Sequence, residues 1–198
     1  MRISSGLLKG RKISSKLPNN KELEGFRPTS GKVKQAIFNI IIHNQNFPDR
    51  FLQSANVLDL CCGTGSLGIE AISRGALGAT FIDNNIEILK LAEKNVAHLG
   101  ADYAKKAKFL RMDAFEIPPK KPTQAGFDLI FLDPPYKEPK TYILPNLMVD
   151  TGWLNKNGFI VLETNKSFEI KELSPKLKLL IEKKYNNTKV FIFGYNLL

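Results

Sequence analysis

The sequence has little cysteine and little histidine. Its 198 residues include two cysteines, the neighbours Cys61 and Cys62, and two histidines. Adjacent cysteines rarely close a disulfide because their Cβ atoms point apart, and two thiols with two distant imidazoles make no zinc-binding pattern. We therefore expect no metal site and interpret both cysteines as small buried residues.

Long hydrophobic runs are also missing. No stretch approaches the roughly 18 apolar residues that a membrane-spanning helix needs. The first six residues, Met1 to Gly6, lack the apolar core of a signal peptide. We expect a cytoplasmic protein that does not enter a membrane.

Acidic residues are too few to balance the basic ones. Lysine and arginine number 29 against 19 aspartate and glutamate, a net charge of +10, and a net +7 of it lies in residues 1–34. A basic excess of this size favours an anionic partner such as nucleic acid. A solvated, lysine-rich surface strip is the alternative interpretation.

The length fits one domain with a small appendage. Residues 1–29 alternate short apolar and basic pieces and predict a β-hairpin. Thr29 or Ser30 then caps a helix to about residue 45, in which Lys34 is expected outside the apolar face. From residue 56 onward, strands and helices alternate, which implies a parallel sheet covered on both faces. The predicted strands are 57–60, 79–83, 107–111, 127–132 and 158–163, with helices at 65–74, 85–99 and 140–149.

The end of the chain breaks this alternation. Residues 177–185 and 188–195 are apolar-rich runs joined by Asn186 and Asn187, which tolerate a positive φ. This pattern is typical of a tight hairpin, so the last strand should be antiparallel to an otherwise parallel sheet.

The stretch from Phe127 to Tyr136 combines a buried strand with an unusual end. Pro134 and Pro135 have no N–H and stop the sheet pairing. The Asp133 carboxylate and the Pro134 carbonyl become two adjacent acceptors, with the Tyr136 ring beside them. Ligands bind at the carboxyl ends of such strands, so this site suits a nucleobase with an exocyclic amine. A strand end followed by a capped proline turn is the simpler alternative.

A glycine-rich turn follows the first strand of the alternating region. Gly63, Gly65 and Gly68 form the Gly-x-Gly-x-x-Gly pattern that dinucleotide-binding enzymes also carry. Asp59, at the end of that strand, would repel a pyrophosphate but attract a cation. Asp83, after the second strand, can accept hydrogen bonds from ribose hydroxyls. The combination favours S-adenosylmethionine over NAD.

Aspartates follow four successive strands. Asp113 comes after the third strand and could accept from an adenine amine. Each acid alone could merely cap a helix. Because the ends of parallel strands meet at one crevice, we expect Asp59, Asp83, Asp113 and Asp133 to converge.

These motifs together resemble the class I S-adenosylmethionine-dependent methyltransferases, and among them the bacterial 16S rRNA guanine-N2 methyltransferases of the small ribosomal subunit. The resemblance spans nearly the whole chain, and its N-terminal segments are the specific part. Cys61-Cys62 and Tyr136 depart from the usual residues of that family, which often has Phe at the latter position. The matching segments are Met1-Arg2-Ile3, Gly10-Arg11-Lys12, Arg27 to Asn39, Val57 to Glu70 and Leu132 to Tyr136.

The resemblance implies a Rossmann-like α/β fold with a seven-stranded methyltransferase sheet whose seventh strand is antiparallel. It divides the chain into a basic RNA-contacting extension, 1–29, and a methyltransferase domain, 30–198. It implies methylation of the 2-amino group of a guanine in 16S rRNA, either naked or in the assembled small subunit. The implied catalytic residues are Asp133, Pro134, Pro135 and Tyr136; the cofactor residues are Asp59, Gly63, Gly65, Gly68, Asp83, Asn84, Asp113 and Ala114; the RNA-binding residues are Arg11, Lys12, Arg27, Thr29 and Lys32.

Three alternatives stay open at this point. A DNA amino-methyltransferase acting on adenine N6 or cytosine N4 shares the Asp-Pro-Pro-Tyr signature, and the residues alone do not distinguish these bases from guanine. A nicotinamide oxidoreductase shares the glycine pattern but is disfavoured by Asp59. A ribosome-associated protein without catalysis would have no need of the four acids.

Overall fold

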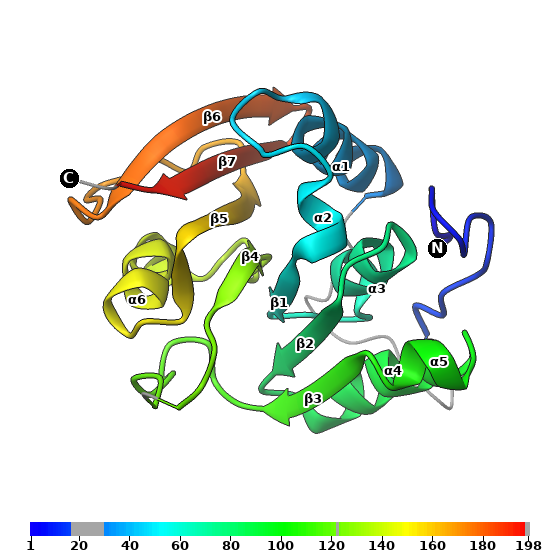
Figure 1. Ribbon diagram of the computed structural model, residues 1–198. Coiled ribbons are helices and arrows are strands. Elements are labelled where there is room, and N and C mark those ends of the chain that lie inside the picture. Colours follow the sequence, from blue (N-terminus) through cyan, green and yellow to red (C-terminus); the bar gives the residue numbers. More distant parts are fainter. Residues whose placement is uncertain (17–29, 122, 197–198) are drawn as a thin grey trace.

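A seven-stranded sheet forms the centre of the computed structural model, which describes residues 1–16, 30–121 and 123–196 (Figure 1). The strand order is β3-β2-β1-β4-β5-β7-β6. The first five strands pair in parallel, and β7 runs antiparallel to both β5 and β6, as the sequence predicts. The strands are β1 (Asn56–Leu60), β2 (Gly78–Asp83), β3 (Ala107–Arg111), β4 (Phe127–Leu132), β5 (Leu154–Asn165), β6 (Leu177–Tyr185) and β7 (Thr188–Tyr195).

The four predicted helices are confirmed, with shifted ends. The one-turn helices α2 and α5 were not predicted, because four residues carry no helical periodicity. No helix in the described ranges is long and apolar enough to cross a membrane. The helices are α1 (Gly31–His43), α2 (Phe51–Ser54), α3 (Ser66–Ser73), α4 (Ile86–Ala97), α5 (Ala101–Ala104), the 3₁₀ helix η2 (Pro139–Ile143) and α6 (Leu144–Asp150).

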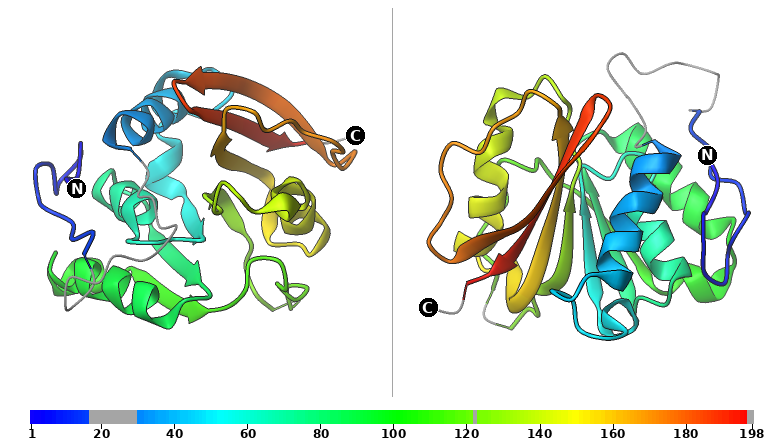
Figure 2. Two further views of the ribbon diagram at one scale, coloured as in Figure 1. Left: turned by 180° about the vertical axis from the view of Figure 1, so that it is seen from behind. Right: turned by 90° about the horizontal axis from the view of Figure 1, so that it is seen from above.

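The sheet lies between two layers. Helices α1, α3 and α4 cover one face and α6 covers the other (Figure 2). Strand β4 contributes to both hydrophobic cores: Leu129 and Phe131 point to one, Ile130 and Leu132 to the other. Successive side chains of a strand alternate between faces, so a strand buried on both sides reads as a continuous apolar run.

The N-terminal arm, residues 1–16, folds back on itself, as the hairpin prediction has it. Arg2 and Lys12 form an antiparallel bridge, and Ile3 N–H donates to the Arg11 carbonyl at 3.0 Å. The arm also bonds to α3: Leu7 N–H donates to the Ser73 carbonyl at 2.8 Å, and Leu8 N–H donates to Ser73 Oγ at 3.0 Å. The arm therefore docks on the body of the protein, on the same side as α1 and α4 (Figure 2).

Lys34 lies in a different environment from the one predicted. It is not outside the apolar face of α1 but fully buried, at 0% exposure. Its Nζ lies 2.8 Å from Glu70 Oε2 and donates to the Arg2 carbonyl at 3.1 Å. Burial alone would raise the pKa of Glu70, but hydrogen bonds from Lys34 and Ser4 outweigh it and leave that pKa below its usual value. Helix α1 packs against the arm and α3 as well as the sheet. It is therefore buried on more sides than the single apolar face that the sequence predicts.

Candidate active site

The carboxyl ends of β1 to β4 bring the four predicted acids together. Cys61, directly after β1, is their common neighbour. Burial raises the pKa of the Cys61 thiol well above its usual value, and the four carboxylates, Asp83, Asp133, Asp59 and Asp113, raise it further. The Cys61 thiol therefore lies within electrostatic range of all four carboxylates.

The glycine turn begins helix α3 behind these acids. Gly63 and Gly65 have positive φ values of 54° and 77°, which glycine adopts without strain. Gly68 serves packing: a Cβ on it would lie 2.4 Å from Cε1 of the Phe81 ring. The first two glycines thus shape the turn, and the third lets α3 approach β2.

Asp59 is buried, with 1% exposure, and supports the turn from behind. Its Oδ2 accepts from Gly68 N–H at 2.8 Å. Burial raises the pKa of Asp59 well above its usual value; the Gly68 hydrogen bond lowers it, and the Asp133 and Asp83 charges raise it again. Burial and the neighbouring charges disfavour the ionised form of Asp59, and a cationic ligand beside it would favour that form.

Asp83 joins the end of β2 to the glycine turn. Its Oδ2 accepts from Gly63 N–H at 3.1 Å, and its Oδ1 accepts from Asn85 N–H at 3.0 Å. Burial raises the pKa of Asp83, while these two hydrogen bonds lower it. The next residue, Asn84, is exposed at the same edge.

Asp113 and Ala114 follow β3. Asp113 is half-buried, and its Oδ1 accepts from Phe115 N–H at 2.8 Å, which closes the local turn. Ala114 is buried. Within the described ranges, no group of three or more His, Cys, Asp or Glu could hold a metal ion. The donor set, carboxylates around a glycine turn, fits a positively charged nucleoside such as S-adenosylmethionine.

The turn after β4 presents acceptors beside this cluster. Asp133 N–H donates to the Leu60 carbonyl at 3.3 Å, which fixes Asp133 next to the end of β1. The carbonyl of Pro135 accepts from Glu138 N–H at 2.9 Å, and that of Tyr136 accepts from Asn165 Nδ2 at 3.0 Å. No donor in the part of the chain that the structure describes reaches the Pro134 carbonyl.

Tyr136 is fixed by its hydroxyl. The Oη donates to Glu163 Oε1 at 3.2 Å and lies 2.8 Å from Thr188 Oγ1. Burial raises the pKa of Tyr136 to about 12; the Thr188 hydrogen bond lowers it, and the Glu163 and Asp133 charges raise it. The phenol therefore stays protonated at neutral pH and holds its ring in place.

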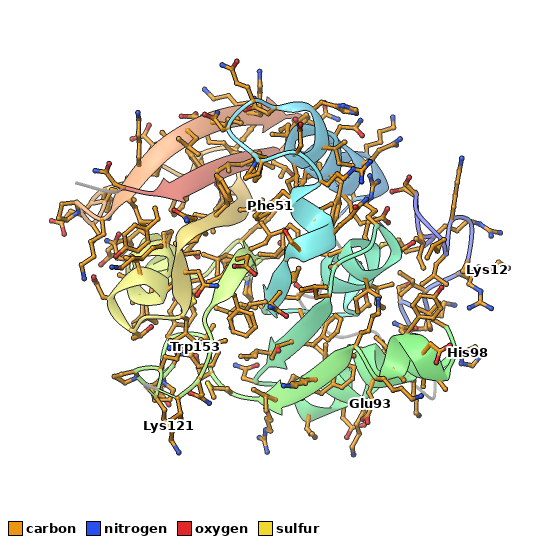
Figure 3. The ribbon with its side chains drawn as sticks, in the orientation of Figure 1. Lys12, Phe51, Glu93, His98, Lys121 and Trp153 are labelled. Carbon is orange, nitrogen blue, oxygen red and sulfur yellow. The ribbon has the colours of Figure 1, made fainter. Side chains whose placement is uncertain are left out.

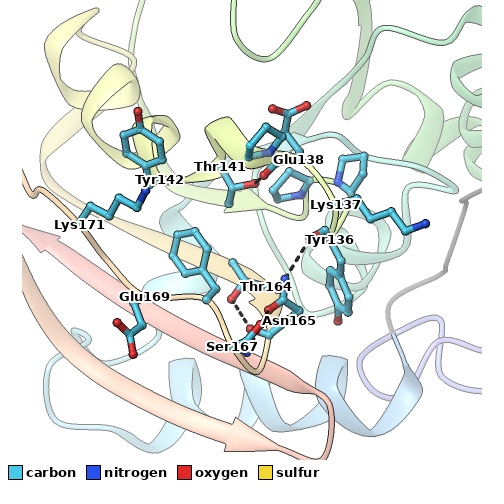
Figure 4. Close-up of a pocket in the computed structure, with 14 residues that line it drawn as sticks. Tyr136, Lys137, Glu138, Thr141, Tyr142, Thr164, Asn165, Ser167, Glu169 and Lys171 are labelled. Carbon is cyan, nitrogen blue, oxygen red and sulfur yellow. Dashed lines mark hydrogen bonds between the residues drawn. The ribbon is translucent and has the colours of Figure 1, made fainter.

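A cavity of about 370 Å³ opens beside the turn, between residues 134–142 and 164–171 (Figure 4). The half-buried rings of Tyr142 and Phe168 line it, and Lys171 Nζ lies 5.3 Å from the centre of the Tyr142 ring. Asn165 Oδ1 accepts from Ser167 N–H at 3.0 Å, which shapes the second wall. The lining residues between 164 and 171 were not predicted from the sequence. They carry no motif and reach the site only through the pairing of β5 with β4.

The predicted RNA-binding residues lie on different elements. Arg11 and Lys12 are exposed on the arm, and Lys12 lies at its outer edge (Figure 3). Arg11 Nη1 also donates to the Leu99 carbonyl at 2.7 Å. Lys32 is exposed on the first turn of α1. Arg27 and Thr29 lie outside the described residues.

Comparison with known proteins places this site in context. A model of the family described as conserved hypothetical protein 95 matches residues 1–194. Ribosomal RNA small subunit methyltransferase D of Buchnera aphidicola subsp. Acyrthosiphon pisum is 32% identical over 186 residues, which cover 93% of this chain and 87% of that protein.

Two solved structures share the fold. The Escherichia coli protein yhhF superimposes with a TM-score of 0.79 and 26% identity, covering 100% of this chain and 99% of that one. An RNA methyltransferase from Salinibacter ruber, solved in complex with S-adenosyl-L-homocysteine, has a TM-score of 0.63 and 16% identity, covering 87% and 95% of the two chains. The seven-stranded sheet is thus the Rossmann-like sheet of methyltransferases.

Proposed function

The chain belongs to the family of conserved hypothetical protein 95 and is similar to ribosomal RNA small subunit methyltransferase D. From this membership and the geometry of the site, we propose the reaction that the protein catalyses. It transfers a methyl group from S-adenosylmethionine to the exocyclic 2-amino group of a guanine in 16S rRNA. Residues 30–198 form the methyltransferase domain, and residues 1–29 form the extension that contacts the RNA, either naked or within the small subunit.

The carboxylate cluster supports the choice of cofactor. Asp83 would hold the ribose hydroxyls, Asn84 and Ala114 would border the nucleoside, and Asp113 would accept from the adenine amine. Gly63 and Gly65 let the ligand approach the backbone, while Gly68 and Asp59 hold the turn. When bound, the cofactor supplies a methyl group on a positively charged sulfur, and the surrounding negative charge favours that cation.

Asp133 and Pro134 orient the amine to be methylated. An exocyclic amine is a weak nucleophile because its lone pair is delocalised into the ring. The Asp133 carboxylate and the Pro134 carbonyl each accept one N–H, which aims the lone pair at the methyl group. Positioning at about 3–3.5 Å then supplies most of the acceleration. Pro135 keeps the turn rigid.

Tyr136 and the cavity receive the base. The ring of Tyr136, fixed by Glu163 and Thr188, offers a face for stacking. The target base must leave its helix, which costs a few kcal/mol. Contacts of rRNA phosphates with Arg11, Lys12, Arg27, Thr29 and Lys32 offset this cost.

The placement of four carboxylates at the carboxyl ends of neighbouring strands, beside the Asp133–Pro134 turn, is the observation that carries the proposal. It is tested by incubating the protein with labelled S-adenosylmethionine and one of three substrates: unmethylated 16S rRNA, small-subunit particles or duplex DNA. Nucleoside mass spectrometry then identifies the product. We expect N2-methylguanosine from the RNA or the particles. N6-methyladenine or N4-methylcytosine from DNA would show that DNA, and not rRNA, is the substrate. Absence of methyl transfer to all three substrates would refute the proposed activity.

A further inference from the structure

Asn95, on helix α4, connects two segments that lie far apart in the sequence. Its side chain is buried, with 6% exposure. The Oδ1 accepts from Ser14 N–H at 2.9 Å, and the Nδ2 donates to the Ser14 carbonyl and the Thr64 carbonyl, each at 3.0 Å. Ser14 belongs to the N-terminal arm, and Thr64 lies between Gly63 and Gly65 in the glycine turn.

The chemistry of this link requires a carboxamide. Asn95 must accept one hydrogen bond and donate two within a single planar group, which a carboxylate or an apolar side chain cannot do. Thr64 is itself buried, at 2% exposure, so water does not readily replace a lost partner. In the described ranges, Asn95 is the one side chain that hydrogen-bonds both the arm and the glycine turn.

The turn that follows this helix holds the arm at a second point. Arg11 donates to the Leu99 carbonyl at 2.7 Å. Glu70 and Ser73 on α3 and Lys34 on α1 also anchor the arm, and none of these three belongs to the glycine turn. A shift of the arm at Ser14 is therefore transmitted to the turn through Asn95.

We infer that Asn95 is a positioning residue that makes the docking of the arm and the shape of the glycine turn interdependent, so that RNA and cofactor bind cooperatively. This inference rests on the proposed function, in which the arm contacts RNA and the turn holds S-adenosylmethionine. Its consequence is reciprocal: each ligand raises the affinity for the other by the same factor.

The test compares wild type with Asn95→Asp, which keeps the size of the side chain and removes both donors. The affinity for S-adenosylhomocysteine is measured by calorimetry with and without saturating 16S rRNA fragment. In wild type, RNA should tighten binding at least about fivefold. In Asn95→Asp we expect this ratio to fall to about one and binding without RNA to weaken roughly tenfold.

Two further variants separate the link from a general loss of structure. Ser14→Pro removes the N–H that donates to Asn95 Oδ1 and changes no residue of the glycine turn or of α4. It should therefore weaken S-adenosylhomocysteine binding although Ser14 lies in the arm, outside the glycine turn. It decides the question alone if Asn95→Asp does not fold. Asn155→Ala is the matched control: Asn155 donates to Asp128 Oδ1 at 2.7 Å, away from both segments, and the ratio should stay at the wild-type value.

The inference is overturned if wild type shows no effect of RNA on S-adenosylhomocysteine affinity, or if folded Asn95→Asp keeps the wild-type ratio. These outcomes differ from failure of the proposed function. Guanine methylation with an unaltered ratio in Asn95→Asp would refute only the link. Weak cofactor binding by Ser14→Pro in a protein that methylates another substrate would support the link and refute the substrate.

Discussion

At the scale of single residues, the site concentrates negative charge at a cost to stability. Burial and neighbouring charges raise the pKa of Asp59, and burial raises that of Asp83. A carboxyl group whose pKa is raised on folding stabilises the folded state at low pH, and this contribution is lost as the pH rises through the raised pKa. At neutral pH these groups therefore favour ligand binding at the expense of stability.

Asp59→Asn should expose this conflict. The amide oxygen can still accept from Gly68 N–H, while the buried charge disappears. We expect the free energy of unfolding at pH 7.5 to rise by about 1 kcal/mol in urea titrations, and the affinity for S-adenosylmethionine to fall. The exposed Asp150→Asn serves as the control, with a change under about 0.5 kcal/mol. An unfolding free energy that falls in Asp59→Asn would contradict the account.

The pH dependence of cofactor binding follows from the same shifts. A bound cation favours the ionised carboxylates, so binding releases protons and lowers the pKa of Asp59 and Asp83. The affinity for S-adenosylmethionine should therefore increase as the pH rises through the raised pKa values of these two carboxyl groups. S-adenosylhomocysteine, which lacks the sulfonium charge, should show a smaller increase. Calorimetry of both ligands across this range checks the sign, and equal dependence for the two would count against the charge argument.

At the scale of elements, one buried ion pair joins α1, α3 and the arm. Lys34 and Glu70 are both fully buried, and Glu70 also accepts from Ser4 N–H at 2.9 Å and Arg74 Nε at 2.9 Å. Removing Lys34 would leave buried Glu70 with Arg74 as its remaining counter-charge, and a buried carboxylate short of a partner is far more costly than a lost exposed pair. The pair therefore fixes how the arm sits on α1 and α3.

Lys34→Met should lower the free energy of unfolding by about 3–5 kcal/mol, because it leaves Glu70 buried without its main counter-charge. Adding Glu70→Gln, which removes that charge, should recover part of the loss. Lys90→Met, which breaks the exposed pair with Glu87 at 3.1 Å, should cost less than about 1 kcal/mol. Denaturant titrations measure all three, and equal effects of the Lys34 and Lys90 changes would refute the role of the buried pair.

Most helices and strands could be predicted from local sequence patterns, whereas the tertiary contacts between them could not. The strands read as apolar runs that end in aspartate, so β1 to β4 and the C-terminal hairpin, with Asn186 at φ 49°, appear in the sequence. β5 begins at Leu154 rather than near residue 158, because it pairs with β4 across a register shift.

Lys34 and the arm required tertiary information. Nothing in the pattern of α1 shows that a third surface covers Lys34, and nothing in the arm shows that its backbone also bonds to α3. The acids and glycines of the candidate site stood out because each lies at or just beyond the carboxyl end of a strand. Asn95 did not, since an asparagine in an amphipathic helix is ordinary until its partners are known.

At the scale of the whole molecule, the basic arm lies on the side of α1 and α4 and carries five exposed cations, Arg2, Lys9, Arg11, Lys12 and Lys16. Arg11 already contacts the Leu99 carbonyl, so its replacement would also loosen the arm. Lys9 and Lys12 are the cleaner probes of phosphate contact.

The double variant Lys9→Gln/Lys12→Gln should weaken RNA binding and make it less sensitive to salt. Each phosphate contact contributes about 0.7–0.9 to the slope of log K against log salt, so the slope should become shallower by about 1.5. Lys156→Gln/Lys178→Gln removes the same charge from exposed positions on β5 and β6 and should leave the slope unchanged. Equal slopes for the two double variants would show that the arm does not contact phosphate.

Asp133 lies between the glycine turn, where we place the cofactor, and the cavity, where we place the base. Its role is tested most directly by single-turnover methyl transfer with Asp133→Ala. Removal of one positioned acceptor should slow transfer by about 10²–10³-fold, while calorimetry shows that S-adenosylhomocysteine affinity is little changed. Transfer at the wild-type rate by this variant would contradict the assignment of the amine to the acceptors at Asp133 and Pro134.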